Sequence, residues 1–558
     1  MSKREDWHKK RQYTAEMLET ARKALDEVIQ GSDVLDAIRH NPLPSGGHIA
    51  KHAIVAVYRR MIESGEMRPD PALLASIRMK PVRSLSGVTT VTILTRPHPC
   101  PGECIFCPDD QRMPKSYLPD EPAAARAYEN NFDPYKQVVM RLRSLSAVGH
   151  PTDKIELLIL GGSWTAYPRD YQEWFVLRCF EAMNEQESSN LEDAQRINES
   201  APHRNVGLVI ETRPDEITPD ELAWLRRLGV TKVQMGAQSL DDRILKLNRR
   251  GHTTVEMLRA VALLRAAAFK IVLHWMPNLL GVTLDSDRLD YTRLWATGSA
   301  LPELSPFGGP CPDEIKVYPT QLLQNAPLYT YWQRGEYQPY TTAELVDLLA
   351  EIKPSTPAYC RINRMIRDIP SLHVVEGNKR TSLRQDVQAE VVRRGQNCNC
   401  IRCREIRGET VTADNLQTDD LVYQPAFSEE HFLSYVTSDN RLAGYLRLSL
   451  PQQGSHWQEE ALGISQDQWN QTFPDLRDAA LIREVHVYGQ ALQVGREQVG
   501  AAQHSGLGTS LLEQAEELAR TRGYSHLAVI AAVGTRQYYA ARGFKSGELY
   551  MVKKIAVG

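Results

Sequence analysis

The sequence contains no apolar run that approaches the roughly 20 residues needed to span a bilayer as a helix. Its first six residues are mostly charged and lack the apolar segment of a secretory signal. We therefore expect a cytoplasmic location and no association with a membrane. In that reducing compartment, the nine cysteines among 558 residues are expected to be metal ligands or free thiols rather than disulfides.

A globally basic protein is also excluded, because the formal net charge is −3. Positive charge is nevertheless concentrated in two places. Residues 353–407 carry twelve Lys or Arg against five Asp or Glu, and the N-terminal segment carries Lys3, Arg4, Lys9, Lys10 and Arg11. The N-terminal cluster alone could equally be a solvated face, but together the two segments could neutralise the phosphates of a nucleic acid.

A chain of this length is expected to form two or three domains. Apolar residues at helical spacing predict a helical extension over residues 1–80, with the basic cluster at its start. A cysteine-rich join at residues 396–408 separates two further domains of different pattern, 81–395 and 409–558. The last domain is predicted to be α+β, with strands near 442–450, 480–487 and 527–533 and a helix at 506–522.

Residues 81–395 alternate short apolar strands with longer helical patterns. The predicted strands are 89–94, 155–160, 206–211, 232–236, 271–275 and 314–318, and helices are predicted at 133–148, 219–228 and 253–268. Such βαβ units build a parallel sheet, and about six of them predict a partial or complete (β/α) barrel with its site at the C-terminal strand ends. The polar residues 185–204 are interpreted as a surface insertion.

Three cysteines, Cys100, Cys104 and Cys107, follow the first predicted strand with C-x3-C-x2-C spacing. Three thiolates can bind three irons of a [4Fe–4S] cube, where an electron-transfer cluster uses four. The known use of the open fourth iron is to bind S-adenosylmethionine, which is then cleaved reductively to a 5′-deoxyadenosyl radical. The alternatives are a zinc knuckle that lacks one ligand, or redox cysteines.

Polar residues and glycines stand where the next predicted strands end. Glycines allow a close approach of the backbone to a ligand, and charged groups at barrel strand ends suit contacts to ribose, carboxylate and substrate. An ion pair that closes the barrel is the alternative for any one charged residue. The candidates are Gly161, Gly162, Ser163, Glu211, Arg213 and Gln238 for cofactor binding, with Lys316 and Tyr318 for catalysis.

A glycine-rich turn precedes the predicted helix of the last domain. Its backbone N–H groups and the helix N-terminus form a cradle for pyrophosphate, and the absence of Gly-Lys-Ser/Thr excludes a nucleoside-triphosphate loop. The Q-x-x-G-x-G pattern resembles the coenzyme A loop of GCN5-related acetyltransferases, which implies that Gln503, Leu507, Gly508 and Thr509 contact the coenzyme. Residues 538–544 resemble the last helix of that family, whose tyrosine can protonate the departing thiolate. Of Tyr538 and Tyr539, we expect Tyr539 to be catalytic and the other to lie in the core.

The two units on one chain resemble the Elongator catalytic-subunit family, in its stand-alone bacterial or archaeal form. The resemblance covers about residues 78–558 and is carried by the blocks 80–84, 100–107, 153–154, 210–215, 248–253, 367–370, 483–489, 534–539 and 550–553. It implies modification of the wobble uridine, position 34, of tRNA, with a [4Fe–4S] cluster on Cys100, Cys104 and Cys107, S-adenosylmethionine, acetyl-CoA and an electron donor. It also implies that acetyl-CoA is bound by the loop residues and by Lys154, Glu484, Val485, His486, Val487 and Tyr539. The family usually has Gly-Gly-Thr where this chain has Gly162-Ser163, and the hydroxyl is retained.

A second group of cysteines, Cys398, Cys400 and Cys403, has no counterpart in eukaryotic members of this family. We expect structural zinc, which takes four ligands, with a second iron–sulfur site or free thiols as alternatives. Cys311 is the expected fourth ligand, because it also lies where eukaryotic members lack cysteine, and His373 is the second choice. Cys179 and Cys360 are expected to be core thiols.

The expected reaction joins the two units. A 5′-deoxyadenosyl radical abstracts hydrogen from the methyl of acetyl-CoA, and the acetyl radical adds to C5 of the uridine. Oxidation of the adduct and thioester hydrolysis then leave a 5-carboxymethyl group. One alternative is a protein-lysine acetyltransferase with a structural iron–sulfur unit, in which Glu484 or His486 is the general base. The other is a non-catalytic tRNA-binding module.

Overall fold

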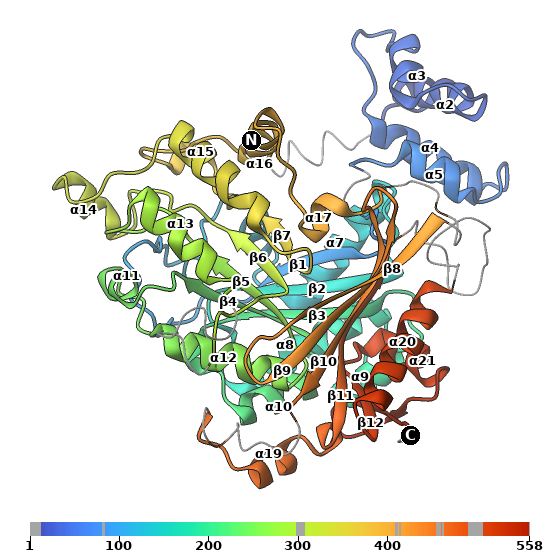
Figure 1. Ribbon diagram of the computed structural model, residues 1–558. Helices are drawn as coiled ribbons and strands as arrows, with labels where there is room; N and C mark the ends of the chain where they lie inside the picture. Colours follow the sequence, from blue (N-terminus) through green and yellow to red (C-terminus); the bar gives the residue numbers. More distant parts are fainter. Residues whose placement is uncertain are drawn as a thin grey trace.

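The computed structural model describes residues 13–80, 84–296, 307–407, 411, 415–452, 459, 462–488 and 506–556. Figure 1 shows two sheets packed together, with a group of helices set apart from them at one corner. Within the described ranges, no helix combines the length and the apolar character that crossing a membrane requires.

The helices at the corner form the N-terminal unit. They are α2 (Ala15–Ile29), α3 (Val34–His40), α4 (Lys51–Glu63) and α5 (Pro71–Ile77). Thr14, Asp33 and Asp70 cap three of them by accepting backbone N–H groups, which satisfies donors that a helix leaves open. Leu25 and Ile54, which the helical spacing singles out, are fully buried between the helices. The basic cluster at residues 3–11 lies outside the described residues.

The first sheet is parallel, and its seven strands are hydrogen-bonded in sequence order. They are β1 (Thr89–Leu94), β2 (Lys154–Leu160), β3 (Arg204–Thr212), β4 (Lys232–Gln238), β5 (Lys270–Trp275), β6 (Glu314–Val317) and β7 (Arg361–Arg364). Since β7 does not pair back to β1 in the described part of the chain, the barrel is partial. The prediction of a partial or complete barrel is confirmed in its partial form.

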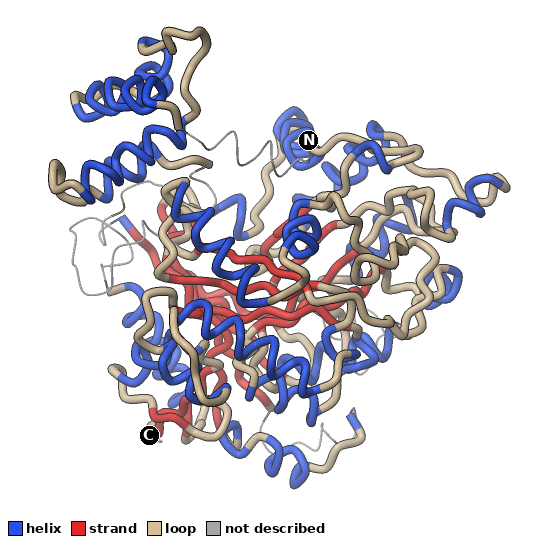
Figure 2. Tube along the Cα trace, turned by 180° about the vertical axis from the view of Figure 1, so that it is seen from behind, coloured by secondary structure: helices blue, strands red, loops and turns tan. Residues whose placement is uncertain are grey.

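Helices cover the outer face of this sheet, as the view from behind in Figure 2 shows. The helices of this domain are α6 (Pro122–Glu129), α7 (Pro134–Ala147), α8 (Arg169–Asn184), α9 (Leu191–Asn198), α10 (Pro219–Arg227), α11 (Asp242–Leu247), α12 (Thr254–Ala266), α13 (Leu284–Arg293), α14 (Leu328–Gln333), α15 (Thr342–Ile352) and α16 (Leu383–Arg393). Of these, α11 and α14 pack with the cysteine loop instead. The three helices that the sequence predicts here are found as α7, α10 and α12.

Residues 185–204 differ from the predicted surface insertion. They contain α9, which packs against α8 and buries Leu191 and Ala194. Asn198 is fully buried, where its amide donates to Asn184 (2.8 Å) and to the carbonyl of His203 (3.1 Å). The segment is exposed on one side, as predicted, but its other side packs on α8 and buries polar groups that are satisfied inside the protein.

The second sheet is mixed and has the strand order β13-β14-β12-β11-β10-β9-β8. Its strands are β8 (Leu416–Tyr423), β9 (Ser428–Thr437), β10 (Leu442–Pro451), β11 (Ala479–Val487), β12 (His526–Val529), β13 (Lys545–Ser546) and β14 (Met551–Lys554), with helices α19 (Gln466–Thr472), α20 (Leu507–Thr521) and α21 (Arg536–Ala540). The short helix α17 (Ile401–Arg404) lies in the join between the two sheets. The α+β prediction for the last domain is confirmed, although its third strand ends at Val529 rather than near 533.

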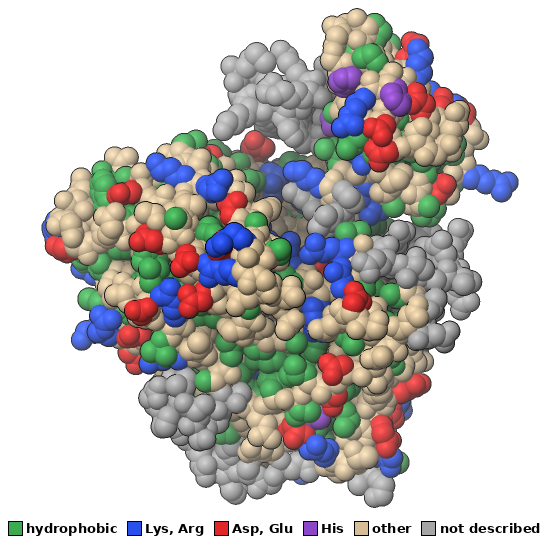
Figure 3. Space-filling model, turned by 45° about the horizontal axis from the view of Figure 1, so that its top comes forward, with side chains coloured by type: hydrophobic (Ala, Val, Ile, Leu, Met, Phe, Trp, Pro, Cys, Tyr) green, Lys and Arg blue, Asp and Glu red, His purple; other side chains and the backbone are tan. Residues whose placement is uncertain are grey.

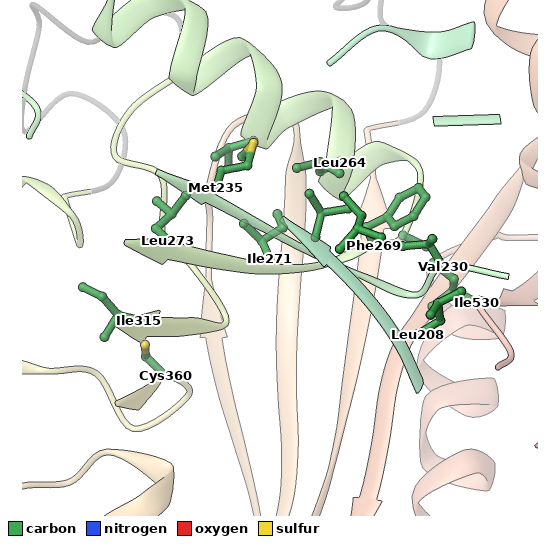
Figure 4. Close-up of a cluster of buried hydrophobic side chains, with 14 of the residues drawn as sticks. Leu208, Val230, Met235, Leu264, Phe269, Ile271, Leu273, Ile315, Cys360 and Ile530 are labelled. Atoms are coloured by element: carbon green, nitrogen blue, oxygen red, sulfur yellow. The ribbon is translucent and has the colours of Figure 1, made fainter. Parts of the chain in front are cut away.

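One hydrophobic core runs through both sheets. Figure 4 shows Ile530 of the second domain beside Leu208 and Val230 of the first. Hydrogen bonds also link the two domains. Tyr550 donates to the carbonyl of Ala267 (2.8 Å), and Arg226 donates to the carbonyl of Leu549 (2.9 Å). The two domains therefore form one packed body, and the site between them has a fixed geometry.

Candidate functional site

A single cavity of about 2000 Å³ extends from the cysteine loop of the first domain to the start of α20 in the second. Among the residues singled out from the sequence, it is lined by Cys100, Cys104, Cys107, Lys154, Gly162, Ser163, Glu211, Arg213, Gln238, Lys316, Tyr318, Glu484, Val485, His486, Val487, Gly508, Thr509, Tyr538 and Tyr539. Gly161, Leu507 and the remaining cysteines do not line it, and Gln503 lies outside the described residues. In Figure 3, Lys and Arg side chains gather around the hollow below the N-terminal helices.

The loop after β1 carries the three cysteines to the C-terminal edge of the first sheet. Cys104 is buried, and Cys100 and Cys107 are half-buried. A hydrogen bond from the Cys107 thiol, helped by the charges of Arg250 and Arg213, lowers the pKa of Cys104 to about 5 in spite of burial. The three sulfurs are not drawn together within 4.8 Å, as the ligands of a single ion would be. A [4Fe–4S] cube does not need its ligands gathered on one ion, because each thiolate binds a different iron.

The end of β2 exposes its backbone to the same cavity. Gly161 and Gly162 have φ of +139° and +91°. A Cβ on Gly161 would overlap the hydroxyl of Thr95, and Tyr167 donates to the Gly161 carbonyl at 3.1 Å. Glycine is therefore required at 161, and the turn presents Gly162 and the Ser163 hydroxyl to a ligand.

Side chains from β3, β4, β5 and β6 meet inside the half-barrel. His274 Nδ1 lies 3.3 Å from a Glu211 oxygen, and its Nε2 lies 3.2 Å from Gln234 Oε1, which Lys316 also contacts. Burial, reinforced by the Lys316 charge, holds the pKa of His274 well below its ordinary value, so the imidazole is neutral. The Lys316 ammonium lies 5.6 Å from the centre of the Tyr318 ring. Within the described ranges it has no carboxylate partner, so it is not an ion pair that closes the barrel.

Arg213 and Gln238 stand at the ends of β3 and β4. Arg213 forms a bidentate pair with Asp215, at 3.0 and 2.8 Å, and lies against Gly102 in the cysteine loop. Gln238 has a left-handed backbone (φ +69°), and its buried Oε1 has no partner in the described part of the chain. A positive φ in a non-glycine residue is uncommon and occurs often at functional sites.

The end of the cavity in the second domain, where we predict the coenzyme, is an open strand edge. β12 pairs with β11 only from Ala479 to Ile482, while β10 pairs with β11 as far as Val487. Glu484 to Val487 therefore have no strand on their β12 side within the described residues. A free edge of this kind can pair with the amides of a pantetheine chain.

The helix α20 begins beside that edge. Its N-cap, Gly506, is left-handed (φ +76°), and Gly506, Gly508 and Thr509 line the cavity. Lys154 lies on the same side of the cavity. It is the first residue of β2 and pairs with Arg204 of β3, and Arg204 packs against Gly534 of the second domain. Burial lowers the pKa of Lys154. Amides and an ammonium here fit a phosphate group.

The exposure of the two tyrosines of α21 is the reverse of the prediction. Tyr539 is only 7% exposed and packs in the domain core against Phe544, whereas Tyr538 is 36% exposed. The Tyr538 ring stacks under Arg542 at 3.7 Å, and its hydroxyl lies beside Gly508. Tyr538 is therefore not a core residue, and both rings line the cavity.

Glu484 and His486 do not have the character of a general base. Glu484 accepts from Lys270 (2.5 Å), Arg447 (3.0 Å) and Tyr445 (2.8 Å). Although burial alone would raise the pKa of Glu484, the charges of Lys270 and Arg447 outweigh it and hold the pKa far below its ordinary range. Burial lowers the pKa of His486 to about 4. Both groups are weak bases at neutral pH.

The second cysteine group is gathered as predicted, but Cys311 is not part of it. The sulfurs of Cys398, Cys400 and Cys403 all lie within 4.8 Å of one another. Cys311, by contrast, is fully buried, and its thiol contacts Tyr359. The prediction of Cys311 as the fourth ligand is wrong, because a shared absence in relatives does not place two segments together in space. The second choice, His373, is hydrogen-bonded to Asp120 at 2.7 Å instead.

Sequence reasoning assigned no role to several polar residues of the cavity. Arg250 belongs to the 248–253 block, which the sequence analysis used only for the family resemblance. Gln234 and His274 are buried polar residues inside strands of the parallel sheet. A polar residue on a strand predicted to be buried is the signal that could have found them.

Comparisons with known proteins agree with this geometry. Residues 98–290 match the model of the Radical SAM superfamily, and residues 312–393 match the Radical_SAM C-terminal domain. A tRNA uridine(34) acetyltransferase of Dehalococcoides mccartyi (strain CBDB1) is 39% identical over 85% of this chain and 99% of its own length. The human Elongator complex protein 3 is 31% identical over 87% of both chains.

A solved structure extends the similarity to three dimensions. The archaeal Methanocaldococcus infernus Elp3 with an N-terminal deletion (1–46) matches with a TM-score of 0.69 and 32% identity, over 84% of this chain and 99% of that one. These relatives share most of their length with this chain, so the similarity includes both domains and the cavity between them. The chain belongs to the Elongator complex protein 3 family.

Proposed function

We propose that the protein is a tRNA uridine(34) acetyltransferase that builds a 5-carboxymethyl group on the wobble uridine from acetyl-CoA, in the cytoplasm. One observation carries this proposal: the cysteine loop and the coenzyme edge line the same cavity. A radical formed at one end can then act on a thioester held at the other. The relative from Dehalococcoides mccartyi and two relatives from Methanocaldococcus species are named tRNA uridine(34) acetyltransferase.

The first domain supplies the groups for the iron–sulfur cofactor and its substrate. Cys100, Cys104 and Cys107 would hold the cluster, and the turn at Gly162 and Ser163 would bind S-adenosylmethionine. When bound, the pair supplies a 5′-deoxyadenosyl radical that can abstract hydrogen from an acetyl methyl. Arg213 and Gln238 line the wall between these groups and would orient the ligand.

The second domain supplies the groups for acetyl-CoA. The free edge at Glu484 to Val487 would pair with the pantetheine, and the amides at Gly508 and Thr509 would hold the pyrophosphate together with Lys154. Tyr539 and Tyr538 both face the cavity and are the candidates to protonate the thiolate when the thioester is hydrolysed.

The charges around the cavity fit an RNA substrate. Arg361, Arg364, Arg367, Arg402 and Arg407 of the basic stretch all line it. Arg361, Arg364 and Arg367 pair with Glu405, Asp368 and Glu121, whereas Arg402 and Arg407 have no carboxylate partner among the described residues. These last two cations could neutralise phosphates of an anticodon stem, and they predict binding that weakens with salt. Inside, Lys316 and Gln234 offer donors of the kind that a uracil carbonyl accepts.

The lysine-acetyltransferase alternative has less support. It requires a base near the thioester, and Glu484 is neutralised by Lys270 and Arg447, while His486 has a pKa of about 4. Radical chemistry has no such requirement at this position. We therefore favour tRNA over a lysine amine as the acceptor.

We also propose a structural zinc ion on Cys398, Cys400 and Cys403. Lys353 donates to Cys403 at 3.5 Å, and this cation favours the thiolate form that zinc requires. The three thiolates supply three of the four ligands of a tetrahedral site. The ion would fix the join between the two domains.

Anaerobic reconstitution tests the proposed function. The protein is incubated with acetyl-CoA, S-adenosylmethionine, reductant and tRNA, and nucleosides from the tRNA are analysed by mass spectrometry. We expect 5-carboxymethyluridine at position 34, with deoxyadenosine formation that depends on both tRNA and acetyl-CoA. Acetylated lysine in the absence of reductant, with no modified uridine, would support the alternative.

A further inference from the structure

Arg250 is a buried cation without a protein carboxylate. Its side chain is 7% exposed, one terminal nitrogen lies 3.5 Å from the Cys104 sulfur, and the other donates to the Gly236 carbonyl at 2.9 Å. The Nε has no hydrogen-bond partner in the described part of the chain, and no ion pair to Arg250 is found there. Within the described ranges, the ionisable side chain to which it donates is that of Cys104.

The other buried arginines of this protein are satisfied by carboxylates or by several oxygen acceptors. Arg213 pairs with Asp215 at 2.8 Å, and Arg483 and Arg447 both pair with Asp313. Arg226 donates to three backbone carbonyls, and Arg404 donates to two carbonyls and to Asn440 Oδ1. Arg250 differs from both groups, because one of its two contacts is a cysteine sulfur of the cysteine loop.

The position of Arg250 is fixed relative to the cysteine loop. Its backbone N–H donates to the Leu245 carbonyl (2.9 Å), and the Asn248 carbonyl accepts the N–H of Ile105, which follows Cys104 (3.2 Å). A Cβ on Gly236 would lie 2.8 Å from the guanidinium, so glycine at 236 leaves the space that Arg250 occupies. The loop and the cation are thus tied together by the fold.

We propose that Arg250 is the counter-ion of the iron–sulfur cluster and raises its reduction potential through a hydrogen bond to the Cys104 sulfur. The inference rests on the proposed function, which places a [4Fe–4S] cluster on this loop. Reduction adds an electron to a site that is already anionic, and a nearby buried cation stabilises the reduced form more than the oxidised form. Hydrogen bonds to the sulfurs, net charge and solvent exposure are the factors by which a protein sets such potentials.

An EPR-monitored redox titration of the reconstituted full-length protein, without tRNA, tests the assignment. Arg250→Gln removes the charge, and Arg250→Lys keeps it. Arg249→Gln is the matched control, because Arg249 is the neighbouring residue and is exposed to solvent. Iron content and thermal unfolding are measured on every variant, so that changes in assembly or folding are detected separately.

We expect Arg250→Gln to lower the ratio of reduced to oxidised cluster at least tenfold at the wild-type midpoint, which corresponds to a downward shift of about 59 mV for one electron. Arg250→Lys should shift the midpoint by less than half as much, and Arg249→Gln should leave it unchanged. If Arg250→Gln does not retain iron, retention by Arg250→Lys supports the counter-ion role.

An unchanged midpoint in a fully loaded Arg250→Gln protein overturns the proposal, as does an equal shift in Arg249→Gln. Loss of iron from both Arg250 variants also overturns it, because the residue would then serve assembly rather than potential. A wild-type protein that binds no cluster refutes the proposed function itself. The two failures are therefore distinguishable.

Discussion

The ion pair between Glu484 and Lys270 distinguishes a structural role of Glu484 from a catalytic one. The pair crosses the domain interface at 2.5 Å, and Glu484 also accepts from Arg447 and Tyr445. Glu484→Gln keeps the shape but removes the charge. Removal of one partner of a buried pair costs about 3–5 kcal/mol. We expect the lower end, because Lys270 keeps Glu314 and Arg447 keeps Asp313 as partners.

This magnitude predicts a small but measurable change in thermal stability. With an unfolding entropy of about 2.1 cal/mol/K per residue, the whole chain has roughly 1.2 kcal/mol/K, so that about 3 kcal/mol lowers the Tm by roughly 3 °C. Differential scanning fluorimetry at neutral pH measures the shift. Glu517→Gln, in an exposed pair with Arg520, is the matched control and should not change the Tm.

A second substitution gives the stricter test. In Glu484→Gln with Lys270→Met, neither charge is left without its partner, so the double variant should be less destabilised than the sum of the single variants. Turnover in Glu484→Gln should fall less than about a hundredfold, because the substitution acts only by displacing the coenzyme at the domain interface. An unchanged Tm together with a loss of turnover of about a hundredfold or more would refute the structural role, because that is the loss expected for a missing general base.

Three further predictions concern other parts of the molecule. Gly508→Val should weaken acetyl-CoA binding at least about tenfold in calorimetry without loss of fold, because its Cβ would lie 2.7 Å from the Tyr538 hydroxyl at the proposed coenzyme site. Glu513→Ala, on the exposed face of α20, is the control. Equal binding by the two variants would contradict the prediction. Cys400→Ser should reduce zinc to less than about a tenth of the wild-type content in elemental analysis, whereas Cys179→Ser should not, and a wild-type protein without zinc would disprove the site. Burial raises the pKa of Asp287 to about 7, so the folded protein favours the protonated carboxyl. The free energy of unfolding therefore falls as pH rises from about 4 to 7, by roughly 4 kcal/mol in total. Asp287→Asn should therefore flatten the fall in Tm between pH 5 and 8, and an unaltered pH profile would count against the raised pKa.

Much of the fold could be predicted because its strands are apolar runs. Residues 155–160 and 271–275 are almost uninterrupted hydrophobic segments, as buried parallel strands are. The strand β7, Arg361–Arg364, was missed because only one of its four residues is apolar and the pattern carries no signal. It forms because β6 offers it a free edge, which is a tertiary effect.

Site residues could be predicted where a local motif fixes them. The cysteine loop and the glycine turn before α20 are of this kind. The C-x3-C-x2-C spacing predicts a set of metal ligands, and the Q-x-x-G-x-G spacing predicts a backbone turn that can bind phosphate. Cys311 and the order of Tyr538 and Tyr539 could not be predicted, because they depend on which way a side chain faces in the folded protein. Arg250 was missed for the same reason, because its burial and its contact with the Cys104 sulfur are visible only in the folded protein.

The central claim is that both cofactors serve one reaction in one cavity. Acetyl-CoA with a trideuterated methyl tests this directly, by mass spectrometry of the deoxyadenosine formed in the presence of tRNA and reductant. We predict that deuterium from the methyl appears in the 5′-deoxyadenosine and that the tRNA gains a 5-carboxymethyl group with the remaining label. Modified tRNA together with unlabelled deoxyadenosine would contradict the account.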